Sequence, residues 1–482
     1  MTAVELFKGL TLVRVPHGGE ELEIDRVVTS PAQAGPHTLY VACRTAIANG
    51  RFGADVAFAR GCRAFLCCND IYPGEGAFVW IADEPERLLG ELAARVCGHP
   101  ARQMTVLVIT GSAGKTSVAL QTVQILRYAG KRVSALTSDG LDLLGECTPP
   151  CAVVPDAAYI QHALWQMAQC GSEIAVLEFS SYQLKHFAAQ SIPFTAVLLT
   201  NLYPRHVGVG EHESLEAYRE AKLSLLSAPS AFYVLPAGLE IQTQTSARVL
   251  RVGEAGDVWA ENVCVENVPA QAPQMRFSLC TRTEKHGGVL PFVGNFAAEN
   301  ALNAATLCRI VGLDMAQIVG GFSSLHAQGR MECIAANYGR LVFLDAAFLP
   351  QDLECVLTSL RALSAGRLCV LLGSVGGRAK ARRAALARVA ERFADHLYLS
   401  ADDPDMEDPL QICSEMRDAM CEPMRADVIT DRRTAILRAV REMRGGDLLL
   451  ILAKPAPAGQ LVGGRLLPFD ERQIVKEAFS EF

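Results

Sequence analysis

The sequence predicts an α/β protein of three domains. Its 482 residues exceed what a single core usually organises, because domains typically hold roughly 100–200 residues. Apolar runs of strand length alternate with helical patterns along most of the chain, which is typical of mostly parallel sheets covered by helices. The character of this alternation changes near residues 100 and 329, and we therefore expect domains at residues 1–100, 101–328 and 329–482.

The first hundred residues predict a small α/β domain, since short apolar strands alternate there with helical patterns. The expected strands cover residues 22–30, 37–44, 63–68 and 78–84, and the expected helices cover residues 53–62 and 85–96.

Longer buried strands, each followed by a helix, predict a central domain with a mostly parallel sheet of the P-loop type. The expected strands cover residues 105–110, 133–138, 174–181 and 194–202, and the expected helices cover residues 117–130, 157–171 and 300–313. Residues 230–290 are richer in strand patterns and are expected to form a β-rich extension of the same domain.

A third α/β pattern after Gly329 predicts a doubly wound, Rossmann-like domain. The expected strands cover residues 340–347, 368–374, 396–403 and 447–454, and the expected helices cover residues 351–363, 380–394 and 432–446.

Composition excludes several classes of partner. The formal net charge is −7, which gives no electrostatic footprint for a nucleic acid or an anionic membrane. No apolar run approaches 18 residues and no leader pattern opens the chain, so we expect a cytoplasmic protein without membrane insertion, acting as a monomer. The 16 cysteines are scattered through apolar runs and are expected to be reduced, because the cytosol keeps thiols reduced.

A glycine-rich segment, TGSAGKTS at residues 110–117, follows the strand TVLVI and precedes a helix. This order places backbone N–H groups and the positive end of a helix around an anion. We expect Lys115 to reach the β- and γ-phosphates of a nucleotide and Thr116 or Ser117 to contact Mg²⁺. Ile109 stands where the full P-loop pattern has glycine, and a strand–turn–helix that merely contains Gly-Lys is the alternative. The expected cradle consists of Gly111, Ser112, Ala113, Gly114, Lys115, Thr116 and Ser117.

The shortened loop, TGxxGKT directly after a strand, resembles the ATP loop of the Mur ligase superfamily, whose members build the peptide of bacterial peptidoglycan. Five further segments resemble motifs of that family and occur in the family's order. They are LEFSSYQL at 177–184, TNLYPRHVG at 200–208 with LEAYREAKLSLL at 215–226, GNFAAENALNAATLC at 294–308, and GRME at 329–332.

The resemblance implies two Mg²⁺ ions and three residues around them. Glu178 would help to hold Mg²⁺, and His206 would lie close to the metal, with Arg205 where the pattern has Asp. Lys222 would be carbamylated by CO₂ and would carry a carboxylate to the second Mg²⁺. A strand-end glutamate and a helix lysine are ordinarily surface residues, so these roles come from the resemblance alone. Lys115, His206 and Lys222 are the expected catalytic residues.

The resemblance also implies the remaining ATP contacts. Asn300 would meet the adenine, although Ala297 replaces the first asparagine of the motif. Arg330 is expected at the ATP phosphate or base, and Asp345 at the ribose or phosphate side.

The N-terminal domain and the CTPP segment resemble those of family members that add the third residue of the stem peptide. The expected partners are therefore a UDP-N-acetylmuramoyl-dipeptide and a free amino acid. Thr148 and Pro149 would face the UDP-sugar-dipeptide, with Ser180 as a further substrate residue. Arg378 and Lys380 would lie over the site.

Departures from the family concentrate where the amino acid would bind. The D-N-P-R motif reads Asp402-Asp403-Pro404-Asp405, and the glutamate of the G-K-G-H-E motif is Pro457. Asp405 would repel the distal carboxylate of diaminopimelate and would attract a cationic side chain such as that of lysine or ornithine. The alternative is a diverged paralogue with changed or lost activity, or with a non-catalytic binding or regulatory role.

Taken with the family, the residues predict an ATP-dependent amide ligase that works through an acyl phosphate. A folate-type polyglutamate ligase of the same fold is a further alternative, which the CTPP segment and the N-terminal domain disfavour. A simple P-loop kinase is disfavoured by Ile109 and by the C-terminal domain, which a kinase does not need.

Overall fold

In the computed structural model, the chain packs into two compact units. The structure describes residues 1–43, 51–151, 153–203, 212–241, 246–266, 271–326, 329–377, 380–453 and 459–480, with the side chains of residues 51, 52 and 295 excepted. The first unit holds residues 1–252 and 306–313, and the second holds residues 253–305 and 314–482. The predicted division into domains 1–100, 101–328 and 329–482 stays a prediction.

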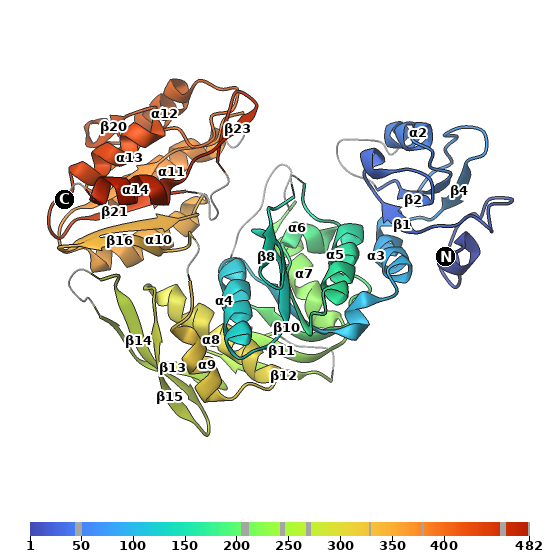
Figure 1. Cartoon of the computed structure of the whole chain (residues 1–482), viewed down its shortest axis with the longest axis horizontal. Helices are drawn as coiled ribbons and strands as arrows, with labels where there is room; N and C mark the ends of the chain where they lie inside the picture. The colour runs from blue at the N-terminus through green and yellow to red at the C-terminus, as the bar shows by residue number, and fades with distance from the viewer. Residues whose placement is uncertain are drawn as a thin grey trace. The chain divides into compact units, whose positions relative to one another are not determined.

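The first unit begins with a small parallel sheet, drawn in blue in Figure 1. Helices cover both of its faces, since the apolar side chains of α1 and α3 share one core cluster while those of α2 belong to another. The alternation predicted for this region is confirmed. The strands, in sheet order, are β1 (Arg26–Val28), β2 (Thr38–Val41), β3 (Ala64–Cys67) and β4 (Phe78–Ile81), and the helices are α1 (Ala3–Phe7), α2 (Arg51–Ala59) and α3 (Pro85–Val96).

A larger sheet forms the rest of the first unit, with the order β12-β11-β10-β5-β9-β6-β7-β8. Pairing is parallel from β12 to β6 and antiparallel for β7 and β8. Figure 1 shows α4 and α5 on opposite sides of these strands, and α5, α6 and the short helix η3 share one apolar core with β5, β9 and β10. The strands are β5 (Thr105–Thr110), β6 (Val133–Thr137), β7 (Gly140–Leu143), β8 (Glu146–Thr148), β9 (Ile174–Glu178), β10 (Phe194–Leu199), β11 (Ser230–Pro236) and β12 (Arg248–Val252); the helices are η2 (Pro100–Gln103), α4 (Lys115–Tyr128), α5 (Ala157–Gln169), α6 (Ser181–Lys185), α7 (Leu215–Leu223) and η3 (Ser224–Ser227).

The second unit opens with an antiparallel meander, so the β-rich character predicted for residues 230–290 is confirmed, while their assignment to the central domain stays a prediction. Helix α9 packs against its last strand, and Phe322 of α9 also approaches Phe277 of the middle strand, with ring centroids 5.5 Å apart. The elements are β13 (Val258–Glu266), β14 (Gln274–Thr281), β15 (Lys285–Leu290), α8 (Asn295–Ile310), whose residues from Thr306 on belong to the first unit, and α9 (Met315–Phe322).

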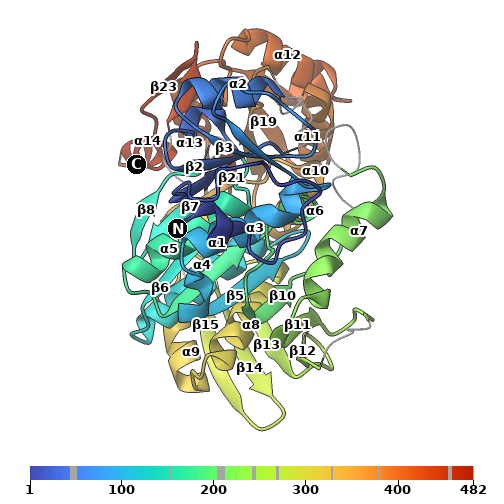
Figure 2. The same cartoon turned by 90° about the vertical axis from the view of Figure 1, so that its right-hand side faces the viewer.

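A six-stranded sheet, β16-β17-β21-β18-β19-β20, completes the second unit, and only β16 runs antiparallel to its neighbour. Alternate residues of the strands enter two separate cores, one with α10, α11 and α12 and the other with α13 and α14. Figure 2 shows these two helix groups on either side of β21, so the predicted doubly wound sheet is confirmed. The elements are β16 (Glu332–Asn337), β17 (Arg340–Asp345), α10 (Pro350–Leu363), β18 (Leu368–Leu372), α11 (Lys380–Phe393), β19 (His396–Leu399), α12 (Pro409–Asp418), β20 (Ala426–Val428), α13 (Arg432–Arg441), β21 (Leu448–Leu452), β22 (Gln460–Val462), β23 (Arg465–Leu467) and α14 (Glu471–Phe479).

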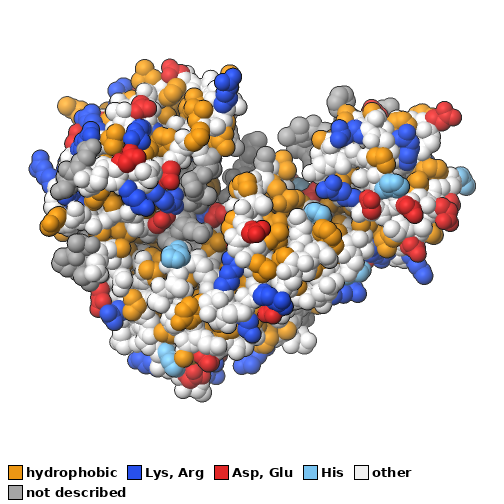
Figure 3. Space-filling model, viewed as in Figure 1, with side chains coloured by type: hydrophobic (Ala, Val, Ile, Leu, Met, Phe, Trp, Pro, Cys, Tyr) orange, Lys and Arg blue, Asp and Glu red, His pale blue; other side chains and the backbone are white. Residues whose placement is uncertain are grey.

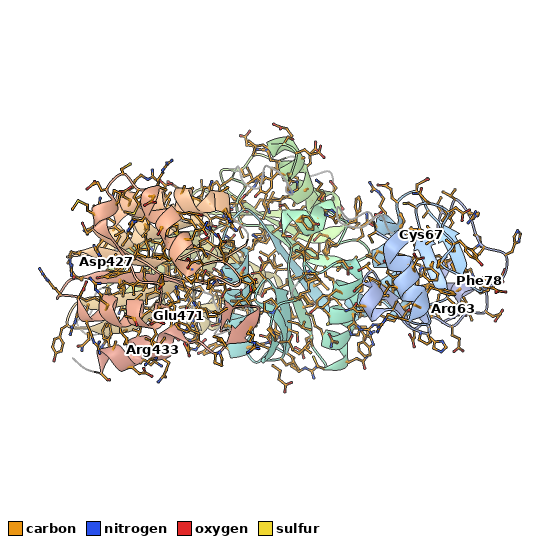
Figure 4. The ribbon with its side chains drawn as sticks, turned by 90° about the horizontal axis from the view of Figure 1, so that it is seen from above. Arg63, Cys67, Phe78, Asp427, Arg433 and Glu471 are labelled. Carbon is orange, nitrogen blue, oxygen red and sulfur yellow. The ribbon has the colours of Figure 1, made fainter. Side chains whose placement is uncertain are left out.

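Two ion pairs join helices α13 and α14, one with a buried arginine and one with an exposed arginine. Arg432, buried at the start of α13, contacts Glu471 of α14 at 3.1 Å, and the exposed Arg433 pairs with Glu477 at 2.5 Å. Figure 4 labels Arg433 and Glu471 on these neighbouring helices. Over the face shown in Figure 3, Lys and Arg side chains are interspersed with Asp and Glu. Within the described ranges, no helix is long and apolar enough to cross a bilayer.

Candidate active site

The glycine-rich loop lies at the carboxyl end of β5, between the ends of its two neighbours β9 and β10. Open parallel sheets bind ligands at such a position, where the strand order changes direction. Gly111 has φ +146°, and a Cβ there would lie 1.9 Å from the Thr200 hydroxyl oxygen. Gly114 has φ +79° and caps the start of α4. Both glycines are therefore required by the backbone, one for close approach and one for the left-handed turn.

The end of β10 fixes the first half of the loop. Asn201 accepts from the N–H of Ser112 through its carbonyl at 3.1 Å and from the N–H of Ala113 through its side chain at 2.8 Å. Thr200 donates its hydroxyl to the Ala113 carbonyl at 2.6 Å. The N–H groups of Ser112 and Ala113 were predicted to bind phosphate, but in the structure both donate to Asn201.

The second half of the loop forms the anion cradle. The first bond within α4 runs from the Val118 N–H to the Gly114 carbonyl at 2.9 Å. The N–H groups of Lys115, Thr116 and Ser117 precede that bond, so they point out of the helix end, where the helix dipole also favours negative charge.

Lys115, Thr116 and Glu178 converge at this helix end, as the sequence predicted. Lys115 Nζ lies 4.0 Å from Glu178 Oε1, and the Glu178 side chain is only 7% exposed. Glu178 Oε2 accepts from the Ser138 N–H at 3.1 Å, while the Ser138 hydroxyl lies 3.0 Å from the Thr116 hydroxyl. A cation, a carboxylate and two hydroxyls therefore surround the mouth of the phosphate cradle.

Lys222 reaches the same loop from α7, although its helix position alone suggested a surface residue. The side chain is 2% exposed, and its Nζ donates to the Gly111 carbonyl at 2.7 Å. It also lies 5.1 Å from the ring centroid of Tyr218, a distance typical of a cation–π contact. The structure thus places Lys222 at the phosphate loop from 111 residues away in the chain.

Tyr218 links α7 to the loop and was not foreseen as a site residue. It is fully buried, and its hydroxyl lies 2.6 Å from Ser112 Oγ. Ser112 Oγ donates to the Tyr203 carbonyl at 3.0 Å and accepts from the Tyr203 N–H at 2.8 Å. Since the Ser112 hydrogen is used there, Tyr218 is the donor in its contact with Ser112.

The oxygen atoms at this site fit Mg²⁺, which prefers hard oxygen ligands and keeps several waters. Thr116 and Glu178 supply such atoms beside the phosphate cradle. His206 and Arg205 lie outside the described residues. Within the part of the chain that is described, no cluster of three or more His, Cys, Asp or Glu side chains forms a ready-made metal cage. An ion here would need phosphate and water to complete its coordination.

The predicted substrate residues of the first unit lie at strand ends or just after them. Thr148 ends β8 and donates its hydroxyl to the Leu141 carbonyl at 3.1 Å, and Pro149 is exposed beside it. Ser180 follows Glu178 and caps α6, where its hydroxyl accepts from the Gln183 N–H at 3.2 Å. A role for any of the three in substrate binding stays a prediction.

In the second unit, Asp345 holds the segment that carries Arg330. Its carboxylate accepts from the N–H of Met331 at 2.7 Å and of Ala347 at 2.8 Å. Burial raises the pKa of Asp345 to about 6, although these bonds and the charge of Arg330 act in the opposite direction. Asn300 is buried on α8. ATP contacts by Asn300, Arg330 and Asp345 stay predictions.

A buried ion-pair network joins two loops at the carboxyl edge of the second unit's large sheet. Arg383 is 1% exposed and donates to Glu407 at 2.9 and 2.8 Å, to Glu415 at 2.6 Å and to the Val375 carbonyl at 3.1 Å. Lys380, predicted to face substrate, pairs with Glu407 at 3.0 Å. Arg383, the Gly377 N–H and Lys380 hold the pKa of Glu407 far below its usual range. Arg378 lies outside the described residues.

The acidic segment 402–405 is fastened to the hairpin of β22 and β23. Asp403 is buried and accepts from the Leu461 N–H at 2.9 Å, and Asp405 Oδ1 accepts from the Gly464 N–H at 2.9 Å. Asp405 has φ +50°, which shows that the backbone there is shaped by the hairpin. Asp402 is partly exposed. The predicted contact of these carboxylates with an amino acid stays a prediction.

Sequence reasoning missed Tyr218, Ser138, Asn201 and Arg383. The sequence contained one usable signal, because Thr200 and Asn201 belong to the TNL segment that follows β10. Nothing in the local pattern marked Tyr218 or Arg383, because their roles depend on partners far away in the chain.

The strand–loop–helix cradle, with a lysine and a carboxylate at its mouth and a second doubly wound sheet in the same chain, defines a nucleotide-using α/β enzyme. Two family profiles match the chain: "Mur ligase middle domain" at residues 109–308 and "Mur ligase, glutamate ligase domain" at residues 329–454. The chain belongs to the Mur ligase family and is an ATP-dependent ligase.

Relatives named UDP-N-acetylmuramoyl-L-alanyl-D-glutamate–2,6-diaminopimelate ligase match it over nearly the full length. The one from Brucella melitensis is 30% identical over 483 residues and covers 96% of both chains. The one from Caldanaerobacter subterraneus is 26% identical over 494 residues, covering 100% of this chain and 99% of its own.

Solved structures share the fold. A ligase of the same name as these relatives has a TM-score of 0.71 at 23% identity, covering 100% of this chain and 99% of its own. A MurF ligase from Thermotoga maritima in complex with ADP has a TM-score of 0.62 at 17% identity, covering 95% and 97%.

Proposed function

We propose that this chain joins a free amino acid to UDP-N-acetylmuramoyl-L-Ala-D-Glu, using ATP, in the synthesis of a peptidoglycan precursor. The relatives' names supply the acceptor. The observation that carries the proposal is the convergence of Lys115, Glu178 and the buried Lys222 on one anion cradle at the end of β5. These groups come from three separate elements, and a bare nucleotide-binding loop would not need Lys222.

In the first step, a carboxylate oxygen of the D-glutamate attacks the γ-phosphorus of ATP. A bond forms between that oxygen and phosphorus, the bond to the β–γ bridging oxygen breaks, and ADP leaves. Phosphoryl transfer is mainly a matter of positioning and charge stabilisation. The N–H groups at the start of α4 and Lys115 would hold the transferring group.

In the second step, the amine of the amino acid attacks the carbonyl carbon of the acyl phosphate. The amide bond forms, the amine loses a proton, and inorganic phosphate leaves with the carboxylate oxygen. Water must be excluded while the acyl phosphate exists, because it hydrolyses readily.

Mg²⁺ would be held by Thr116 and Glu178 together with phosphate and water, and it would screen the negative charge of the phosphates. His206 and a carbamylated Lys222 would complete a second site. Carbamylation is chemically accessible only to a neutral amine, and the buried position of Lys222 beside the Gly111 carbonyl keeps the product within reach of the loop.

For the amino acid, we propose a substrate with a cationic side chain, such as lysine or ornithine. Asp405 keeps a carboxylate at the motif position where the family places an arginine, and its Oδ1 accepts from the Gly464 N–H of the hairpin. A negative charge at that position opposes the distal carboxylate of diaminopimelate. We further propose a cytoplasmic monomer, which light scattering on the purified protein would check.

The test is phosphate release from ATP and Mg²⁺ with the UDP-dipeptide and each amino acid in turn. We expect release only when both acceptor and a suitable amino acid are present, with lysine or ornithine preferred over diaminopimelate. Lys115→Ala should reduce release at least about 100-fold, because the phosphoryl group loses its positive partner. Silence of the wild type across all amino acids would overturn the proposal.

A further inference from the structure

We propose that a hollow in the first unit, away from the phosphate loop, binds a small organic anion with an apolar body. This hollow, called here the η2–α6 pocket, has a volume of about 870 Å³, within the range of small-molecule sites. Its wall comes from α3 and η2, from the segment that links α6 to β10, and from η3 with the start of β11. Its ionisable lining residues are Arg87, Glu91, His99 and Arg102.

The pocket lies at the edge of the sheet opposite to the phosphate loop. His99 and Arg102 directly precede β5, and the lining residues Phe194 and Ser230 are the first residues of β10 and β11. The phosphate loop follows the other end of β5. Since β5 has six residues and a strand rises about 3.3 Å per residue, the two sites are separated by about 20 Å of strand. The pocket is therefore separate from the cradle that would hold ATP.

The inner wall of the pocket is apolar. Leu184, Ile192, Phe194 and Leu225 line it and are themselves buried members of the central core, so the wall is firm. Phe187 adds an aromatic ring, and the Arg87 guanidinium lies over this ring, 4.1 Å from the ring centroid. Such a wall favours the apolar body of a ligand, because contact with it removes apolar surface from water.

The rim of the pocket is positively charged. Arg87, Arg102 and His99 line it, although Arg87 already pairs with Glu84 at 2.6 Å. Among the lining residues the opposing carboxylate is Glu91, which already receives the Arg95 guanidinium at 2.8 Å. Burial acts to raise the pKa of Glu91, but hydrogen bonds from Arg95 and Ser191 bring it below its ordinary value, so its charge is present and is matched by Arg95.

Arg102 is the cation left for a ligand. Its guanidinium is exposed, and among the residues that the structure describes it makes no hydrogen bond or ion pair with a side chain. A guanidinium at the rim of an apolar hollow fits the carboxylate, sulfonate or phosphate of an organic anion. The ligand class is therefore an anion whose remaining part is apolar or aromatic.

The test uses 8-anilinonaphthalene-1-sulfonate, an aromatic sulfonate whose fluorescence rises when it leaves water. The full-length wild type should bind the probe at one site, and Arg102→Glu should bind it about tenfold more weakly, because one attraction becomes a repulsion. Arg102→Gln should fall between the two. Neither change breaks a contact seen in the structure, so the thermal unfolding midpoint should stay at the wild-type value.

The matched control is Arg248→Glu, since Arg248 is another exposed arginine of the first unit and lies on β12 outside the pocket. This variant has the same change of net charge and should bind the probe like the wild type. Equal affinity in Arg102→Glu and Arg248→Glu would overturn the assignment.

Two competitors test the place and the ligand class. ATP with Mg²⁺ should leave the probe bound, and displacement would put the probe in the phosphate loop and overturn the proposal. Sodium sulfate at the probe's concentration should also leave it bound, because sulfate lacks an apolar body. Displacement by sulfate would reduce the pocket to a simple anion site and overturn the ligand class. None of these readouts depends on ligase activity.

Discussion

Removing one hydroxyl at Tyr218 should weaken the use of ATP without unfolding the protein. Tyr218→Phe deletes the donor that reaches Ser112 Oγ at 2.6 Å and keeps the ring beneath Lys222. Ser112 still contacts both backbone groups of Tyr203, so it is not left without partners. The lost bond is therefore worth about 1 kcal/mol, the typical net value for a neutral hydrogen bond. If this bond helps to hold the loop in the position that binds ATP, its loss should lower kcat/KM for ATP about fivefold.

The assay is steady-state phosphate release at varied ATP, with a matched control. Tyr233 is also fully buried in the first unit, and its hydroxyl donates to the Ala228 carbonyl at 2.6 Å, in the segment before β11 rather than at the phosphate loop. Tyr233→Phe should therefore cost similar stability and leave kcat/KM for ATP unchanged. The reasoning is refuted if the two variants lower kcat/KM equally, or if Tyr218→Phe has the wild-type value.

Three further perturbations test other parts of the structure. Gly111→Ala should abolish ATP binding, measured by calorimetry, because its Cβ would lie 1.9 Å from the Thr200 hydroxyl oxygen; wild-type affinity would show that the loop has another conformation. Asp345 has a pKa of about 6, raised above the ordinary value near 4, so the folded state binds an extra proton between these values and stability falls as pH rises from about 4 to about 6, by roughly 2–3 kcal/mol. The thermal midpoint of the wild type relative to Asp345→Asn should fall over that pH range and then level off, and a flat difference would contradict the raised pKa. Arg383→Ala should lower the thermal midpoint clearly more than Arg433→Ala, since Arg383 is 1% exposed and joins two loops while the Arg433 pair is largely exposed; equal midpoints would contradict a structural role for the network.

Helices and strands with strong periodicity were predictable from the sequence, and elements that depend on partners were not. The helix expected at residues 85–96 and the strand expected at 105–110 have those bounds in the structure. The helix expected to start at residue 300 begins at Asn295, and the strand expected to reach residue 403 ends at Leu399. Helix α12 and strand β20 were missed because they are short, with ten and three residues, and depend on packing against α11 and on pairing with β19.

The candidate site followed the same division. The loop, Glu178 and Lys222 could be singled out from the sequence, because they lie in motifs that occur in the order of one family of nucleotide-using enzymes. Asn201 and Tyr218 act on loop residues that lie 88 and 106 positions away, and no local pattern records such contacts. The commitment of the Ser112 and Ala113 N–H groups to Asn201 likewise emerges only when β10 pairs beside β5.

If the reaction passes through an acyl phosphate, an oxygen atom of the acceptor carboxylate must end up in the released phosphate. With oxygen-18 in both carboxylates of the D-glutamate, one labelled oxygen should leave with each inorganic phosphate when ATP, Mg²⁺ and the amino acid are present, because the carbon–oxygen bond to the phosphate breaks in the second step. Mass spectrometry of the released phosphate measures this directly. Phosphate that carries the label would support the ligase account, and phosphate released without the label would contradict it.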